Sequence, residues 1–255
     1  MMIDLLSFIT PPDMSQAAAL LLIFFSFIGS LITVAFGIGG GALLLAVMAV
    51  TVPSAALVPV HGVVQVGSNL GRAILLVRHT FWHALPWFIV GSVIGVVLGG
   101  RIVVQIEPWV VQTGVGLFIL WSISFTPPKW LSRWPLMTGL ISSFLTMFFG
   151  ATGMFVATFS KSLSLGRHSH VATHATLMLV QHLFKSVTFA FLGFAFLPWL
   201  VFIMLMILAG VLGTLVGNMA LKHMTDARFH RALDIVLGLI ALRLVWSGLR
   251  SAFGE

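Results

Sequence analysis

Apolar runs of about 20 residues recur from one end of the sequence to the other, and no other feature limits the possible folds as strongly. A helix rises about 1.5 Å per residue, so a run of that length crosses a hydrocarbon core about 30 Å thick. Hydrophobic residues make up 59% of the 255 and charged residues only 7%, which leaves too little polar surface to cover a soluble particle. We therefore predict an all-α, polytopic helical membrane protein.

Glycine, proline and charged residues bound the apolar runs and place the predicted spans. The eight ranges are 17–36, 54–77, 84–106, 109–125, 134–149, 169–191, 198–221 and 230–249. Two shorter apolar stretches, 42–50 and 154–160, each follow a break that contains glycine and are predicted to be half-helices. The connecting loops are short, so we expect no soluble domain.

The formal net charge of +7 would suggest a nucleic-acid partner in a soluble protein. Here the basic residues sit mostly at the ends of apolar runs, which is typical of charges that face anionic membrane lipid. We therefore expect lipid around the chain and no nucleic acid. The chain has no cysteine, which excludes disulfides and thiolate metal sites.

The two halves of the chain resemble each other. An offset of 113 residues aligns five polar or glycine positions, namely Gly37 with Gly150, Gly40 with Gly153, His61 with His174, Asn69 with His182, and Arg72 with Lys185. We predict a first repeat at 1–126, a linker loop at 127–133 and a second repeat at 134–255, with about four spans in each. Transporters are often built from two such repeats, with the binding site at midplane where broken helices meet.

Span counting leaves two matters open. Four crossings in each half make the repeats parallel, whereas a short segment that completes a crossing makes them inverted. With eight spans, four basic residues fall on the side of the N-terminus (Arg78, Lys129, Arg133, Arg250) and six on the other (Arg101, Lys161, Arg167, Lys222, Arg228, Arg231). This division favours an N-terminus outside the cell.

Glycine interrupts the chain after the first span. Residues 37–41 contain four glycines, each of which destabilises a helix by roughly 1 kcal/mol and leaves backbone amides uncovered. If 42–50 is helical, its N-terminal amides form an anion site. The alternative is close helix packing through small residues. The partner break, 150–153, has Thr152 where the first half has Gly39. Met154, directly after that break, stands where the first half has Gly41.

Polar side chains follow one face of the helix after each break. His61, Gln65, Ser68, Asn69 and Arg72 stand at relative positions 0, 4, 7, 8 and 11, while His174, Gln181, His182 and Lys185 stand at 0, 7, 8 and 11. A charge in the membrane costs about 2.5 to 3.5 kcal/mol, so such residues normally face a cavity or a partner. The alternative is that Arg72 and Lys185 extend to the headgroups.

The sign of these charges indicates the kind of ligand. Of six acidic residues only Asp234 lies inside a predicted span, and cation carriers usually need intramembrane carboxylates. An anion is therefore the expected substrate. His170 and His174 lie one helical turn apart, but no carboxylate or thiolate completes a metal site, so we expect neither metal nor cofactor. No nucleophile motif or base-orienting acid accompanies the polar faces, which argues against an enzyme.

The segment Phe36–Ala42 (FGIGGGA), followed by 58–72 (VPVHGVVQVGSNLGR) and then a similar module, resembles the sulfite exporter (TauE/SafE) family of membrane permeases. The resemblance implies secondary transport of a sulfur-containing or carboxylate anion, such as sulfite, sulfoacetate or a sulfonate, across the cytoplasmic membrane of a bacterium. The site residues that it implies are Gly37, Gly39, Gly40, Gly41, His61, Gln65, Asn69 and Arg72, with Gly150, Gly153, His174, Gln181, His182 and Lys185 in the second half.

The expected mechanism places Arg72 and Lys185 beside one cavity between the repeats. Amides at the breaks, together with Gln65, Ser68, Asn69 and Gln181, would replace the hydration of the anion. His61 or His174 would titrate near neutral pH and couple transport to a proton. An anion channel, a carboxylate transporter and an intramembrane enzyme are the alternatives. Exact substrate, direction, coupling ion and any homo-oligomer are left open.

Overall fold

A computed structural model describes residues 9–36, 39–103, 106–127, 133–220 and 227–253. Throughout these residues the regular secondary structure is helical, and no strand occurs among them. The main helices are α2 (Gln16–Phe36), α3 (Gly40–Thr51), α4 (Ser54–Leu75), α5 (Leu85–Val103), α6 (Pro108–Ser124), α7 (Pro135–Phe149), α8 (Gly153–Ser162), α9 (Arg167–Phe191), α10 (Leu200–Ala220) and α11 (Ala227–Phe253). The predicted all-α class is confirmed.

Each predicted span overlaps one long helix, and the two predicted half-helices correspond to α3 and α8. The one-turn 3₁₀ helices η1 (Val77–His79), η2 (Trp82–Ala84) and η4 (Leu197–Trp199) lie in the connections before α5 and α10. By length and composition, four stretches of the described residues can cross a membrane: Gln16–Ala35, Trp82–Val103, Leu197–Gly217 and Arg231–Phe253. The count of eight crossings stays a prediction.

Two helix pairs join one helix of each half and run parallel. On α5, a Cβ atom added to Gly91 would collide with the backbone of α7 at Leu136, and one added to Gly99 would collide with Met147 further along. In the same way, α10 packs its glycines against the backbone of α2. Small residues at such interfaces let two backbones approach closely, which is how membrane helices associate when lipid removes the hydrophobic driving force.

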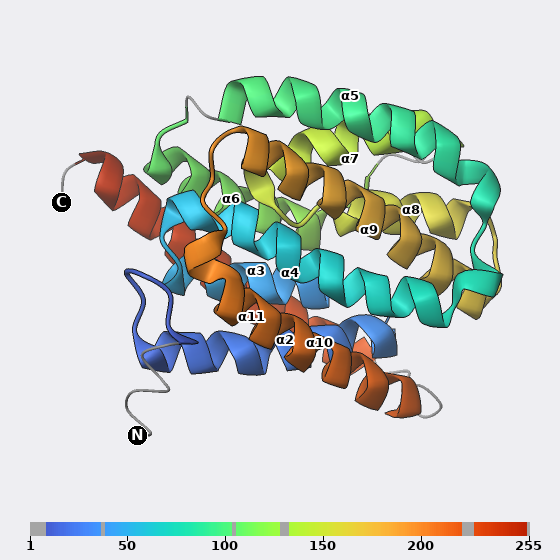
Figure 1. Cartoon of the computed structure of the whole chain (residues 1–255), viewed down its shortest axis with the longest axis horizontal. Helices are drawn as coiled ribbons and strands as arrows, with labels where there is room; N and C mark the ends of the chain where they lie inside the picture. Colours follow the sequence, from blue (N-terminus) through green and yellow to red (C-terminus); the bar gives the residue numbers. More distant parts are fainter. Residues whose placement is uncertain (1–8, 37–38, 104–105, 128–132, 221–226, 254–255) are drawn as a thin grey trace.

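Helices at equivalent places in the two halves run antiparallel. The rings of His61 on α4 and His182 on α9 have centroids 5.8 Å apart, whereas the backbone N–H of Phe81, beyond the end of α4, donates to Thr173 Oγ1, near the start of α9 (2.9 Å). Helices α6 and α11 are also antiparallel: Gly116 of α6 lies against Ala241 of α11, whereas Thr113, earlier in α6, lies against Gly248, later in α11. Figure 1 shows α4 and α9 side by side.

The first five helices therefore run opposite to the second five, which decides between the parallel and inverted arrangements. The order in both sets is one long helix, one short helix and three long helices. The short helix α3 begins beside Gly29, in the middle of α2, and ends next to the start of α4. It thus returns the chain to the side where α2 begins, and this return inverts the second set. The repeat boundaries themselves stay a prediction.

The described ends of the bundle differ in charge. We call face A the end where α2 and α4 begin, and face B the end where α4 ends and α9 begins. At these two ends, the basic residues whose side chains the structure describes are Arg78, Arg133, Lys161 and Arg231 at face B, and Arg101 and Arg250 near face A. The predicted division, which put Arg78 and Arg133 with the N-terminus and Arg101 opposite, is wrong because it did not count the return through α3.

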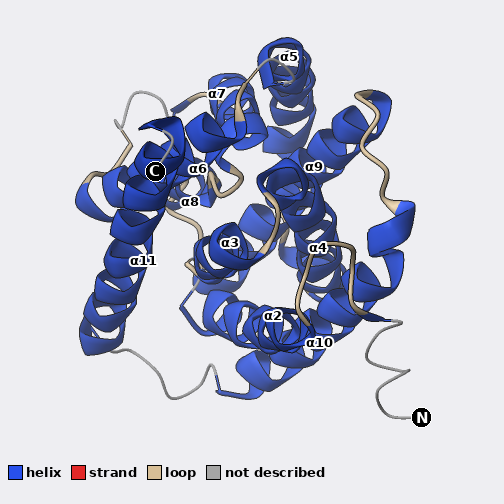
Figure 2. Cartoon of the chain, turned by 90° about the vertical axis from the view of Figure 1, so that its left-hand side faces the viewer, coloured by secondary structure: helices blue, strands red, loops and turns tan. Residues whose placement is uncertain are grey.

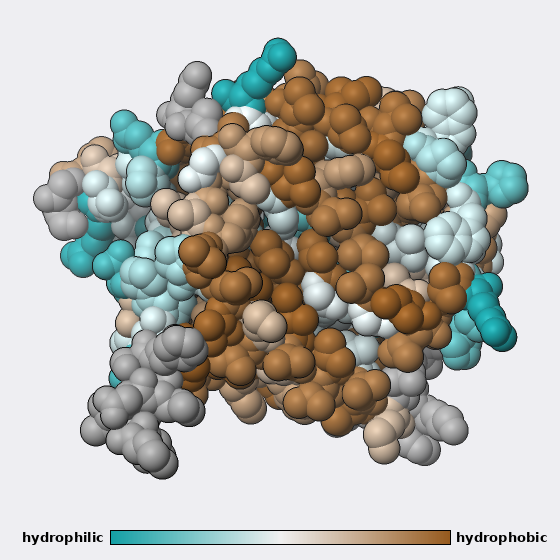
Figure 3. Space-filling view, in the orientation of Figure 1, coloured by the Kyte–Doolittle hydropathy of each residue, from teal (hydrophilic) through white to brown (hydrophobic). Residues whose placement is uncertain are grey.

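Helix α3 occupies the centre of the bundle, surrounded by the long helices (Figure 2). Its residues from Leu43 to Ala49 are all buried, as expected of a helix that is apolar on every side. The outer surface is apolar as well: hydrophobic side chains cover the middle of the face in Figure 3, and hydrophilic groups gather toward its two ends. Such an apolar belt between polar ends is the surface of a multi-pass membrane protein.

Candidate functional site

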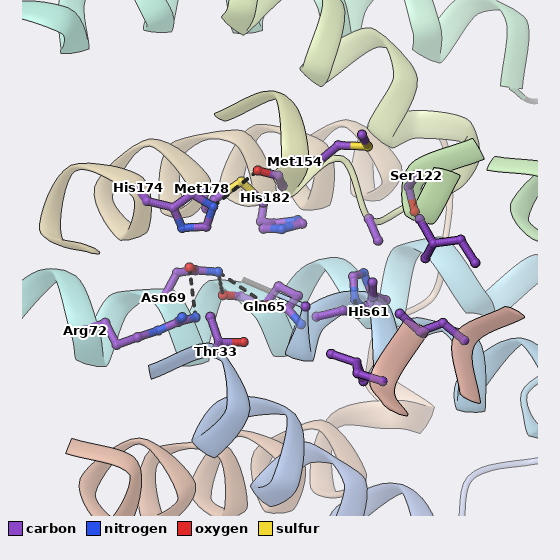
Figure 4. A pocket seen from close by; sticks show the side chains of 18 of the residues that line it. Thr33, His61, Gln65, Asn69, Arg72, Ser122, Met154, His174, Met178 and His182 are labelled. Atoms are coloured by element: carbon purple, nitrogen blue, oxygen red, sulfur yellow. Dashed lines mark hydrogen bonds between the residues drawn. The ribbon is translucent and has the colours of Figure 1, made fainter. Parts of the chain in front are cut away.

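A cavity of about 150 Å³ lies between α4 and α9, beside the first turns of both short helices. Its lining comes from both halves of the chain. The lining residues are Thr33, Gly39, Gly41, Ala42, His61, Gln65, Asn69, Arg72, Ser122, Ile123, Ala151, Gly153, Met154, His174, Met178, His182, Leu233, Asp234 and Leu237. Figure 4 shows the α4 side chains in one row and His174, Met178 and His182 of α9 in a row facing it.

The polar row on α4 lies on the helix face toward the cavity, as its spacing predicts. His61, Gln65, Asn69 and Arg72 all line the cavity. The Asn69 Nδ2 donates to the Gln65 carbonyl oxygen at 2.8 Å and lies 3.4 Å from Gln65 Oε1. These contacts along one helix hold the amides in place, so the row presents a preformed polar surface.

Arg72 is buried, with 3% of its surface exposed. Its Nε donates to the Ser68 carbonyl oxygen (3.2 Å), and its Nη2 lies 3.3 Å from Ser68 Oγ and 3.0 Å from Asn69 Oδ1. All three acceptors are neutral, and within the described part of the chain no carboxylate accepts a hydrogen bond from the guanidinium. The Nη1 group makes no hydrogen bond to a described residue. A buried guanidinium with free N–H groups and neutral partners is prepared to receive an anion.

The two glycine breaks bring backbone to the cavity in similar ways. Gly39 has φ +103° and Gly150 has φ +74°, a region that favours glycine, and each begins a sharp change of direction. His61 Nε2 lies 3.1 Å from the Gly41 carbonyl oxygen, and His174 Nε2 lies 3.3 Å from that of Gly153. A carbonyl only accepts, so each Nε2 carries the donating proton.

The first turns of α3 and α8 both contribute to the cavity wall, through Gly41 and Ala42 on one side and Gly153 and Met154 on the other. Backbone N–H groups in the first turn of a helix lack intrahelical partners, and the helix dipole is positive there. Two short helices that begin at one cavity therefore add positive potential to that of Arg72.

Several predicted site residues lie elsewhere. Gly37 falls outside the described residues. Gly40 is packed against α2, where a Cβ atom would overlap the carbonyl group of Gly29, so the packing alternative holds at that position. Ser68 is buried behind the row, where its Oγ lies 2.9 Å from Ser30 Oγ. Gly150 precedes the cavity-lining Ala151 without lining the cavity itself.

Lys185 does not share the cavity with Arg72. It is fully buried behind the second break, where its Nζ lies 3.5 Å from the Gly150 carbonyl oxygen. Gln181 is also behind that break and donates to Thr152 Oγ1 at 2.7 Å. Lys185 turns this way because Gly62 on α4 leaves the space: a Cβ there would lie 2.7 Å from Lys185 Cε. Both cations are buried in protein, so the alternative that they extend to the headgroups is wrong.

The sequence pattern missed part of the lining. Thr33, Ser122, Met154 and Met178 follow no polar spacing that would single them out. Asp234 had a signal, since it is the one acid inside a predicted span, but nothing local to α11 places it at the cavity. Asp234 is exposed, lines the cavity and lies in the part of α11 nearer to face B.

Comparison with known proteins agrees with this arrangement. The family described as Sulfite exporter TauE/SafE matches residues 21–244, which include both breaks and both polar rows. No curated protein and no solved structure gave a match. The family consists of integral membrane permeases for sulfur anions, and the match covers most of the sequence. The chain therefore belongs to the sulfite exporter TauE/SafE family.

Proposed function

We propose that the protein is a secondary transporter that moves a small sulfur-containing anion, such as sulfite, sulfoacetate or another sulfonate, across the cytoplasmic membrane. The observation that carries the proposal is Arg72, a buried guanidinium that lines the cavity and has only neutral hydrogen-bond partners among the described residues. An uncompensated buried charge is unfavourable unless a counter-ion visits it. The substrate anion is that counter-ion.

Neutral donors around Arg72 would replace the hydration shell of the anion. The side-chain amides of Gln65 and Asn69 line the same wall, and the first turns of α3 and α8 add backbone N–H groups. A sulfonate or sulfite presents three oxygens, each able to accept charge-assisted hydrogen bonds. The cavity is small enough to favour such an anion over a bulky one.

Alternating access follows from the opposite directions of the two halves. In this proposal the cavity opens toward face B beside the exposed Asp234, and the completely buried Leu45, Met48 and Met147 close the side toward face A. Because the halves are related by inversion, exchanging their conformations would close the opening at face B and open one at face A. The direct contacts between α4 and α9 would change most during this exchange.

Charge indicates the orientation in the membrane. Among basic residues whose side chains the structure describes, Arg78, Arg133, Lys161 and Arg231 lie at face B, against Arg101 and Arg250 near face A. By the bias of Lys and Arg toward the cytoplasm, face B is cytoplasmic and the start of α2 lies outside. The structure would then be the state open to the cytoplasm.

Counterflow in proteoliposomes tests the proposal. Vesicles are loaded with one unlabelled anion from a panel of sulfite, methanesulfonate, sulfoacetate and acetate, and uptake of the same labelled anion is measured. We expect saturable exchange of sulfur anions that exceeds exchange of acetate. Flux that does not saturate would indicate a channel, faster exchange of acetate would indicate a carboxylate transporter, and conversion of the anion without exchange would indicate an enzyme. A homo-oligomer stays a prediction.

A further inference from the structure

The crossing of α4 and α9 contains a group of nitrogen atoms that the anion contacts of Arg72 do not use. We call His61, His182 and Lys185 the crossing cluster. The two imidazole rings meet edge to face with centroids 5.8 Å apart, and Lys185 lies three residues after His182, against Gly62 of α4. All three side chains are at most 1% exposed.

The cluster is short of hydrogen-bond partners. His61 Nδ1 and His182 Nδ1 are buried without any partner among the described residues. Because His61 Nε2 donates to Gly41, its Nδ1 is a free acceptor. The Lys185 ammonium has three donors, yet its only hydrogen bond to a described residue is the long one to Gly150. Each of these three groups can therefore gain or lose a proton without giving up a strong hydrogen bond to a described residue.

Among the described residues, no carboxylate forms a hydrogen bond or ion pair with a member of the cluster. The charged and titratable groups around it are Arg72 on α4, His174 on α9 and Asp234 on α11, all of which line the cavity. Helices α3 and α7 carry no titratable side chain, α8 carries Lys161 at its far end, and α5 carries Arg101 near its end. A proton on the cluster therefore adds a second positive charge close to the permanent charge of Arg72.

We infer that the crossing cluster is a proton-binding site at the edge of the anion cavity, with Lys185 behind it, and that one proton travels with each anion in the same direction. The inference rests on the proposed transport function. Two positive charges in a poorly solvated interior repel each other, and an anion beside Arg72 removes that repulsion. Anion binding therefore favours protonation, and by linkage protonation favours anion binding to the same degree.

The cluster also touches both broken segments. His61 bonds to Gly41 at the start of α3, and Lys185 bonds to Gly150 just before α8. Adding or removing the proton changes the hydrogen bonds to the glycine breaks before α3 and α8. These breaks are the parts of the fold that we expect to move. This is a physical link between proton occupancy and the state of the cavity. It replaces the earlier expectation of His61 or His174 alone as the coupling group.

The experiment separates exchange from driven uptake. Proteoliposomes receive labelled methanesulfonate, which stays ionised and carries no proton of its own, either in counterflow or with an imposed gradient of one pH unit, acid outside. For wild type we expect exchange, and roughly tenfold accumulation from one coupled proton per anion. Lys185→Met and Lys185→Gln, which change a side chain outside the cavity lining, should keep exchange within about threefold of wild type and lose accumulation. Lys161→Met, which changes a lysine exposed on face B, is the matched control and should behave as wild type.

Each outcome decides one question. Full accumulation by both variants would overturn the proton site. If the variants lose both exchange and accumulation but elute as wild type on size exclusion, the mutated residue belongs to the anion site instead. If Lys185→Met does not fold, Lys185→Gln alone decides. Absence of exchange in wild type would count against the proposed function, whereas exchange without accumulation would count against the proton site only.

Discussion

Replacing Arg72 with Gln removes the charge that we place at the centre of anion binding. The guanidinium uses Nε and Nη2 to hold neutral groups of its own helix and leaves Nη1 for the substrate. Losing the charged partner of a desolvated pair weakens binding by about 2 to 5 kcal/mol. Because the cavity opens to water beside Asp234, we take about 2 to 4 kcal/mol, which is roughly a 30- to 700-fold increase in Kd.

The Arg72→Gln variant should remain folded, since removing a buried charge that pairs with no described carboxylate relieves a desolvation penalty. Binding of labelled sulfite to purified protein measures Kd, and the temperature of unfolding in detergent monitors the fold. Arg101→Gln, the same change at an exposed position near face A, is the control and should leave Kd unchanged. An Arg72→Gln protein that is folded and binds within threefold of wild type would refute the role of Arg72.

Three further predictions address the fold, the mouth of the cavity and the orientation. Gly40→Ala forces a Cβ atom into the backbone of α2 and should lower the unfolding temperature by several degrees, whereas Gly238→Ala, which meets its nearest atom at 3.4 Å, should not. Asp234→Asn removes a negative charge that repels the entering anion and should lower the half-saturation concentration up to roughly fivefold at low salt, an effect that high salt should abolish. Since the chain has no cysteine, a single introduced cysteine reports its own side of the membrane. Ser162→Cys on face B should react with an impermeant maleimide only from the cytoplasm, and Glu107→Cys near face A only from outside. The opposite labelling pattern would reverse the proposed orientation.

Local patterns were sufficient for the helices and for the row on α4. Helix limits follow from apolar runs and their punctuation, which are properties of neighbouring residues. The positions of His61, Gln65, Asn69 and Arg72 on one face follow from the helical period once the segment is helical. The structure places all four at the cavity for that reason.

Properties that depend on distant contacts could not be predicted in this way. Lys185 has the same spacing as Arg72, but it turns behind the second break because Gly62, on another helix, makes room for it. Asp234 reaches the cavity through the packing of α11 against α6 and α3. Whether Arg78 and Arg101 lie at face A or face B depends on whether the short helix α3 turns the chain back. The composition of α3 does not show in which direction it runs.

The pairing of α2 with α10 has a consequence for how the protein is made. Synthesis of α2 is complete long before α10 leaves the ribosome, because α2 ends at Phe36 and α10 begins only at Leu200. Until then the surface of α2 that receives the glycines of α10 must be covered by lipid or by the insertion machinery. A nascent chain halted before Leu200 would therefore hold α2 without its partner α10, and premature termination should direct the product to degradation.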